Sequence, residues 1–230
     1  TQDESYYILD CDDDAVVYLG LKEGVCKEEM LAALHEAQEG GKPFDAGRFV
    51  NQWPAKKHDH FLIPAGTIHC SGSNCMVLEI SATPYIFTFK LWDWGRLGLD
   101  GRPRPVHLQH GEKVIQWDRT TGWVRDNLVR RAHVVEEEEG FCEEFTGLHE
   151  QEFLETRRDT LQGEHTFTGE GSVQMCNVVD GEGAVIASPQ EEFSEFTVHY
   201  AETFILPASI GAFTIRPLGE ECRILRAYVR

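Results

Sequence analysis

The sequence predicts a mainly β protein built from two jelly-roll barrels, with a short helical insertion in the first barrel. Short apolar or alternating runs recur between turn residues, as is typical of β-sandwiches and barrels; they include 6–9, 15–19, 60–63, 76–80, 85–89, 173–179, 183–186, 203–206, 213–215 and 223–229. One amphipathic helix is expected at 27–38, where Met30, Leu31, Leu34 and Ala37 form an apolar stripe before Gly40-Gly41. A further helical turn is expected within 45–51.

An internal repeat supports two barrels rather than one. Residues 58–69 align with 201–212, which places Pro64 on Pro207, and residues 12–17 align with 181–186. His69 aligns with Ala212. We therefore expect the second copy to keep the strands and the turn but to lack the functional histidine. The expected organisation is a first barrel in 1–120, a connector in 121–147 with an edge strand near 122–125, and a second, metal-free barrel in 148–230.

Composition limits the classes of function that the protein can have. The 230 residues carry a formal net charge of −18, which argues against nucleic-acid binding because phosphate backbones are bound through excess lysine and arginine. We expect one acidic stretch to be a solvated face; it consists of 136–139 with Glu143, Glu144, Glu150, Glu152 and Glu155. No apolar run reaches the length of a membrane span. Seven cysteines form no CxxC pair, so we expect reduced thiols and a cytoplasmic protein.

The segment 58–69 carries the most specific signal. Its apolar run ends at Ile63, Pro64-Ala65-Gly66 turns the chain, and His69 begins the next strand. Downstream follow Glu79 in Val-Leu-Glu-Ile, then Leu-Trp-Asp-Trp-Gly-Arg ending at Arg96, then Asp-Gly-Arg-Pro-Arg around Arg102. Together these motifs resemble the class I mannose-6-phosphate isomerases of the cupin superfamily, well over the first 120 residues and more loosely over the last 80.

The resemblance implies a zinc site. Family members hold zinc with a Gln-x-His pair, a glutamate before an aromatic strand, and the histidine of the Pro-Ala-Gly-Thr-x-His turn. His69 and Glu4 match the last two, and the default alternatives are a core histidine and a frayed surface carboxylate. The Gln-x-His pair has no counterpart, and a lysine usually found two residues before the glutamate is Gln2. We expect the remaining ligands on an N-terminal segment outside this sequence, or else a divergent, incomplete site.

The implied reaction converts mannose 6-phosphate to fructose 6-phosphate through a cis-enediol(ate). Arg96 is the candidate cation for that intermediate, with a surface ion pair to Asp93 as the structural alternative. Glu79 is the candidate proton carrier, or simply a carboxylate hydrogen-bonded within the sheet. Arg102 falls where a phosphate-contacting residue lies in the family.

Other readings stay open at this point. A non-catalytic paralogue that binds a sugar or sugar phosphate would retain the framework without turnover. A metal-dependent cupin dioxygenase could use His58, His60 and His69, although no downstream motif supports it. His107 could line the pocket. Both the isomerase and the non-catalytic paralogue would bind a small molecule as their partner. The sequence carries no signal for an oligomeric state.

Overall fold

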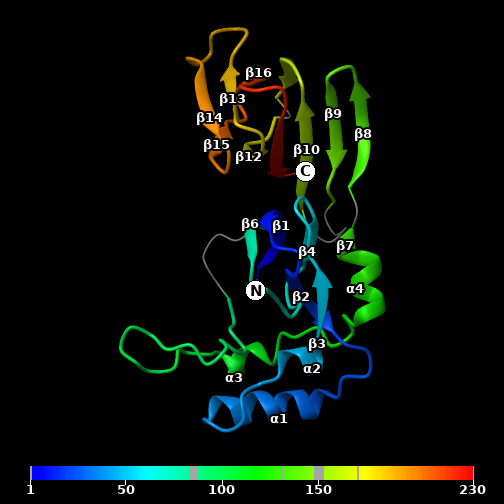
Figure 1. Ribbon diagram of the computed structural model, residues 1–230, viewed down its shortest axis with the longest axis vertical. Helices are drawn as coiled ribbons and strands as arrows, with labels where there is room; N and C mark the ends of the chain where they lie inside the picture. The colour runs from blue at the N-terminus through cyan, green and yellow to red at the C-terminus, as the bar shows by residue number, and fades with distance from the viewer. Residues whose placement is uncertain (1, 83–87, 131, 148–152, 170, 230) are drawn as a thin grey trace. The chain divides into compact units, whose positions relative to one another are not determined.

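The computed structural model describes residues 2–82, 88–130, 132–147, 153–169 and 171–229. The chain divides into two compact units, Thr1–Val129 and Arg130–Arg230 (Figure 1). Each unit is built mainly from antiparallel strands, which confirms the predicted fold class. No helix of the described ranges is both long and apolar enough to span a membrane.

The first unit contains two sheets, with strand orders β6-β1-β4-β7 and β3-β2-β5. Its elements are β1 (Asp3–Cys11), β2 (Val16–Leu21), α1 (Lys27–Gln38), α2 (Ala46–Phe49), β3 (Val50–Pro54), β4 (His60–Ile63), β5 (His69–Ser71), β6 (Cys75–Ala82), α3 (Leu108–Gly111), α4 (Thr121–Asn127) and β7 (Val129–Arg130). β1 pairs antiparallel with β4 on one side and β6 on the other. Of the predicted run 85–89, residues 85–87 lie outside the described ranges.

The helical insertion lies between β2 and β3, as predicted. α1 has the expected bounds; Met30, Leu34 and Ala37 are buried, and Gly40 follows with a φ of +84°. These side chains share a core with Phe44, Phe49 and Leu108, from the segment around α2 and from α3. Figure 1 shows α1, α2 and α3 gathered at one end of the first unit.

The second unit is a sandwich of a six-stranded sheet, β15-β12-β17-β10-β9-β8, and a four-stranded sheet, β11-β16-β13-β14. Both sheets contribute to its core, for example Val178 and Ile224 from one and Ile186 and Phe213 from the other. The strands are β8 (His133–Glu138), β9 (Phe141–Phe145), β10 (Leu154–Leu161), β11 (His165–Thr168), β12 (Gln174–Asp180), β13 (Gly183–Ala187), β14 (Phe196–His199), β15 (Thr203–Leu206), β16 (Ala212–Pro217) and β17 (Cys222–Val229).

The sequence repeat is a structural repeat. β4 and β15 occupy aligned positions, and each is followed by the same turn: Thr67 N–H donates to the Pro64 carbonyl oxygen, and Ile210 N–H donates to that of Pro207, both at 3.1 Å. Before each strand, His58 and its counterpart Ala201 adopt positive φ angles of 73° and 64°. The chain therefore builds one framework twice.

The segment expected to be a connector contains regular elements. Residues 122–125 lie in α4, not in an edge strand, although tryptophan and valine favour strands. Val124 is fully buried and its Cγ2 lies 2.2 Å from where a Cβ on Gly20 would be, so the helix packs directly on the glycine of β2. Tertiary packing overrides local propensity here. Residues 133–145 form the hairpin β8–β9 at the edge of the six-stranded sheet.

The acidic stretch has two different structural roles. Glu136, Glu137 and Glu138 lie on the edge strand β8 with exposed side chains, as the sequence indicated. Glu143, Glu144 and Glu155 are instead partly buried and bound to arginines. Glu150 and Glu152 lie outside the described ranges.

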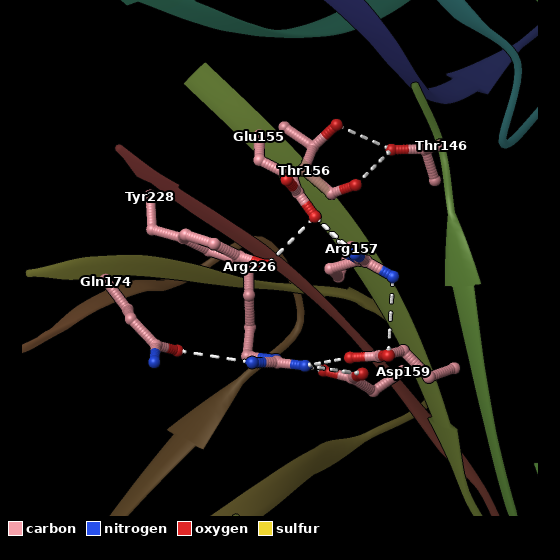
Figure 2. A network of polar contacts seen from close by, with 9 residues as sticks. Thr146, Glu155, Thr156, Arg157, Asp159, Gln174, Arg226 and Tyr228 are labelled. Carbon is pink, nitrogen blue, oxygen red and sulfur yellow. Dashed lines mark hydrogen bonds and ion pairs between the residues drawn. The ribbon is translucent and has the colours of Figure 1, made fainter. Parts of the chain in front are cut away.

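A polar network crosses the inner face of the second unit (Figure 2). Arg226, which is 3% exposed, donates to both carboxylate oxygens of the fully buried Asp159, at 2.5 and 3.0 Å, and to Glu143 Oε1 at 2.6 Å. Its guanidinium lies 4.8 Å from the centre of the Phe167 ring. Arg157 continues the network to Glu155, which also accepts a hydrogen bond from the Tyr228 hydroxyl at 3.1 Å. Buried charges are thus paired rather than isolated.

We expect Asp159→Ala to lower the free energy of unfolding by about 3–5 kcal/mol, because it leaves Arg226 buried without its bidentate partner. Urea denaturation followed by far-UV circular dichroism measures this change. The matched control is Glu164→Ala, which breaks the exposed pair with Arg216 at 3.8 Å and should cost at most about 1 kcal/mol. Equal losses for the two variants would contradict the assigned role.

Candidate active site

A cavity of about 640 Å³ opens in the first unit, between strands and the segment that follows β6. Strand residues Glu4, Tyr6, Tyr18, His69 and Cys70 line it. Lys90, Trp92, Trp94 and Arg96 line it from the segment after the sheet. The cavity therefore combines two potential metal ligands, two cations and several aromatic rings.

The turn before His69 is held by local hydrogen bonds. Gly66 adopts a φ of +84°, which glycine tolerates without strain. Thr67 donates to the Pro64 carbonyl oxygen through both its N–H and its hydroxyl, at 3.1 and 2.6 Å. The N–H of Ala65 donates to Asp3 Oδ1 at 2.7 Å, which ties the turn to the start of β1.

His69 and Glu4, the two predicted metal ligands, face each other. The His69 ring nitrogen Nδ1 lies 2.8 Å from the Thr67 carbonyl oxygen, so it carries a proton and donates it there. The other nitrogen, Nε2, lies 2.5 Å from Glu4 Oε1. Glu4 is held on β1, opposite Ile63 of β4 and Ser81 of β6. The edge of the Tyr6 ring packs against the imidazole at 5.5 Å between centroids.

Gln2 links Glu4 to the predicted proton carrier. Its amide nitrogen donates to Glu4 Oε2 at 2.5 Å and to Glu79 Oε1 at 3.3 Å. Glu79 lies on β6 directly opposite Tyr6, and it is more exposed than its apolar sequence neighbours suggested. Its carboxylate nevertheless belongs to the same cluster as Glu4.

The site shifts the pKa values of all these groups. Burial alone would raise the pKa of Glu4 and lower that of His69, but their mutual hydrogen bond and charge attraction outweigh it, so the Glu4 pKa is lowered and the His69 pKa is raised. Burial and the neighbouring Glu4 carboxylate raise the pKa of Glu79. Burial and both carboxylates raise the pKa of the Tyr6 hydroxyl.

The donor set fits part of a divalent metal site. Histidine nitrogen and carboxylate oxygen are suitable ligands, and the hydrogen bond from Nδ1 to a backbone carbonyl is the arrangement that orients ligating histidines. The buried Gln2 Oε1 beside Glu4 has no hydrogen-bond partner. Across the described ranges, no group of three or more histidine, cysteine, aspartate or glutamate side chains is arranged so that it could hold a metal ion. Glu4 and His69 therefore fit a metal but need further ligands.

Arg96 reaches the cavity through a tight turn. Trp94 and Gly95 both have positive φ angles, the Arg96 N–H donates to the Asp93 carbonyl oxygen at 2.9 Å, and the Trp94 ring meets Tyr18 edge-on. The recorded ion pairs of Asp93 are with Lys90 and Arg104, at 3.4 and 3.1 Å, and not with Arg96. The guanidinium instead lowers the pKa of Cys70, although burial outweighs it and raises that value to about 11.

Among the described residues, Glu79 and Arg102 are the two predicted site residues that do not line the cavity. Arg102 lies in an exposed loop, where its N–H donates to Asp100 Oδ1 at 3.1 Å. Lys90 lines the cavity. It belongs to the locally basic segment 90–104, whose positive excess in an acidic chain predicts an anion such as a sugar phosphate.

The remaining histidines lie outside this lining within the described chain. His58 contacts the Tyr7 hydroxyl through Nδ1 at 3.0 Å, and His60 packs against the Tyr7 ring. His107 packs near Phe89, and its Nδ1 accepts the Lys90 N–H at 3.3 Å. These contacts give the three side chains structural roles.

The pairing of Glu4 with His69 predicts a bell-shaped pH dependence. A double-mutant cycle with Glu4→Gln and His69→Gln, measured by urea denaturation without metal, should give a coupling of about 2 kcal/mol. The coupling should be complete between pH 4.5 and 6.5, the ordinary values of the two groups. It should be lost as the pH rises through the raised His69 pKa, and as it falls through the lowered Glu4 pKa.

The control cycle uses the exposed pair of His35 and Glu112, which lie 3.3 Å apart. Its coupling should stay below about 1 kcal/mol at every pH. A coupling between Glu4 and His69 that does not change from pH 5 to pH 9 would rule out an ion pair.

Known proteins that resemble this chain are found among curated sequences and solved structures. No protein-family model matches the chain. Two curated relatives come from Bacillus subtilis strain 168. The chain is 24% identical to "Probable mannose-6-phosphate isomerase GmuF", over 92% of its own length and 60% of the relative. It is 23% identical to "Mannose-6-phosphate isomerase ManA", over 94% and 62%.

A solved structure extends this likeness to the fold. The crystal structure of the mannose 6-phosphate isomerase from Bacillus subtilis matches with a TM-score of 0.78 and 21% identity, over 99% of this chain and 65% of that one. The chain thus spans about 60% of the length of the curated relatives it matches. The chain is similar in sequence to these mannose-6-phosphate isomerases and shares the fold of the solved one.

Proposed function

We propose that the protein is a metal-dependent aldose–ketose isomerase that interconverts mannose 6-phosphate and fructose 6-phosphate. The observation that carries the proposal is the presence of Glu4, His69 and Arg96 in one cavity, two suited to a metal and one to an anionic intermediate. The likeness to mannose-6-phosphate isomerases supports the choice of substrate.

Zinc is the proposed metal, because the nitrogen and carboxylate donors of His69 and Glu4 are ligands that zinc accepts. When bound, the metal supplies a Lewis acid that polarises the substrate's oxygens. Two protein ligands are fewer than zinc sites use, so we propose that additional ligands complete the site. The hydrogen bond from His69 Nδ1 to Thr67 leaves Nε2 oriented toward Glu4 for this purpose.

Arg96 and Glu79 are the proposed catalytic residues. An enediol(ate) carries negative charge on its O1 and O2 oxygens, and a guanidinium presents planar donors to two such oxygens at once. Glu79 has a raised pKa, which suits a group that takes a proton from one carbon and returns it to the next. Its carboxylate is fixed near Glu4 through Gln2.

The phosphate group needs a further cation. Lys90 lines the cavity, and Arg102 follows in the same basic segment, on an exposed loop. We propose these two side chains for the phosphate, with Arg102 retained from its sequence position.

The proposed partner is this small molecule alone, in keeping with a charge of −18. All seven cysteines are free thiols, which supports a cytoplasmic protein.

We expect Arg96→Met to lower kcat for mannose 6-phosphate by about 10²–10³-fold, because a fixed donor to the developing charge is lost. His69→Gln should lose both bound zinc and turnover. Fructose 6-phosphate formation and zinc content by elemental analysis measure these effects. Arg125→Met is the matched control, because Arg125 is exposed and pairs with the adjacent Asp126.

Three outcomes have distinct meanings. Unchanged turnover in a metal-loaded Arg96→Met protein would remove the role of Arg96 alone. Absence of both metal and turnover in the wild-type protein would reject the isomerase. If the wild-type protein binds mannose 6-phosphate by calorimetry without converting it, the non-catalytic sugar-phosphate-binding paralogue takes its place.

A further inference from the structure

Arg119 makes an unusual set of contacts with the turn that precedes His69. Its Nη1 donates to the Pro64 carbonyl oxygen at 2.7 Å, to the Ala65 carbonyl oxygen at 2.8 Å, and to the Thr67 hydroxyl oxygen. All three acceptors belong to one four-residue turn, although Arg119 lies more than fifty residues away in sequence. Arg119 lies just before α4, so its guanidinium connects the segment that leads into α4 to this turn.

The turn passes its position on to His69. Thr67 is bound by Arg119 through its hydroxyl, and its carbonyl oxygen accepts the hydrogen bond from His69 Nδ1 at 2.8 Å. That hydrogen bond fixes both the ring orientation and the proton on Nδ1, which leaves Nε2 facing Glu4. A shift of the turn would change the acceptor's position and hence the imidazole's orientation.

Arg119 is itself held in place by contacts that do not involve the turn. Its carbonyl oxygen accepts the Leu21 N–H at 2.9 Å, which attaches it to the end of β2. Its guanidinium also lies 5.3 Å from the centre of the Trp123 ring. Next to it, the Thr121 hydroxyl donates to Asn51 Oδ1 and the Gly122 N–H donates to Glu23 Oε1. The side chain thus reaches the turn from an anchored backbone.

The corresponding turn in the second unit shows that the backbone hydrogen bond of the turn forms without a histidine after it. Pro207–Ile210 forms the same 3.1 Å backbone hydrogen bond, and the residue that follows in the place of His69 is Ala212. The N–H of Gly211 there donates to a carboxylate, Glu192, at 3.2 Å. The backbone hydrogen bond that closes the turn is therefore distinct from the contacts that orient the histidine.

We propose that Arg119 is a positioning residue that holds the Pro64–Thr67 turn so that His69 Nε2 faces Glu4. It contacts neither the proposed metal nor the sugar phosphate, and it acts through Thr67. The inference rests on the proposed function only in its kinetic readout, since the orientation of His69 can be measured without metal or substrate.

The test compares Arg119→Met, Arg119→Lys and the control Arg125→Met on the same segment. Long-range ¹H–¹⁵N correlation spectra of the metal-free protein, recorded at a pH above the raised His69 pKa so that the ring is neutral, report the His69 tautomer. We expect one tautomer with a protected Nδ1 proton in the wild type and the control, and exchange between tautomers in Arg119→Met. Zinc affinity, from competition with a chromogenic chelator, should fall by about 10–100-fold, with kcat lowered and KM within about twofold.

Arg119→Lys retains the charge but loses the planar group, so it should recover only part of the tautomer preference. If Arg119→Met does not fold, the spectra of Arg119→Lys decide the question by the same criterion. His69 signals identical to the wild type in the folded variant would overturn the proposal. Altered His69 signals in a protein without isomerase activity would uphold it and reject only the proposed function.

Discussion

The pairing register of β1 between β4 and β6 is the constraint on which the site depends. It sets Glu4 opposite Ile63 and Ser81, at the end of the sheet where the turn brings His69 back. Because side chains alternate along a strand, a slip of one residue would place Ser5 where Glu4 lies and remove the carboxylate from the histidine. Tyr7 and Ile8, which follow in β1 and are both fully buried on opposite faces, oppose such a slip, because each packing site would have to accept a side chain of different shape.

The chemistry follows from placing like and unlike charges at close range. Glu4, Glu79 and His69 form a cluster in which the histidine stabilises one carboxylate and the first carboxylate disfavours ionisation of the second. Such a cluster suits both a cation between Glu4 and His69 and a proton carrier at Glu79. Arg96 adds positive charge to the lining of the cavity, and the ion pairs of Asp93 are with Lys90 and Arg104 instead.

Much of this could be predicted from sequence, for identifiable reasons. α1 was predictable because its apolar stripe and glycine stop are local, and the repeat was visible because both copies keep the Pro-Ala turn. The partnership of Glu4 with His69 came from motif resemblance. The exposed position of Arg102 and the helix at Trp123 could not be predicted, because both depend on tertiary contacts. Arg119 carried no motif, since two of its three acceptors in the turn are backbone carbonyl oxygens, which leave no signature in the sequence.

The edge strand β8 has a consequence for handling the protein in solution. An edge strand exposes backbone groups that another chain can pair with, and charged side chains are a common defence. Here the defence consists of successive glutamates, which repel a second copy of the same strand. Salt screens repulsion between exposed charges. Buffers of high ionic strength would therefore favour strand-to-strand aggregation through this edge, and storage at low ionic strength keeps the repulsion in place.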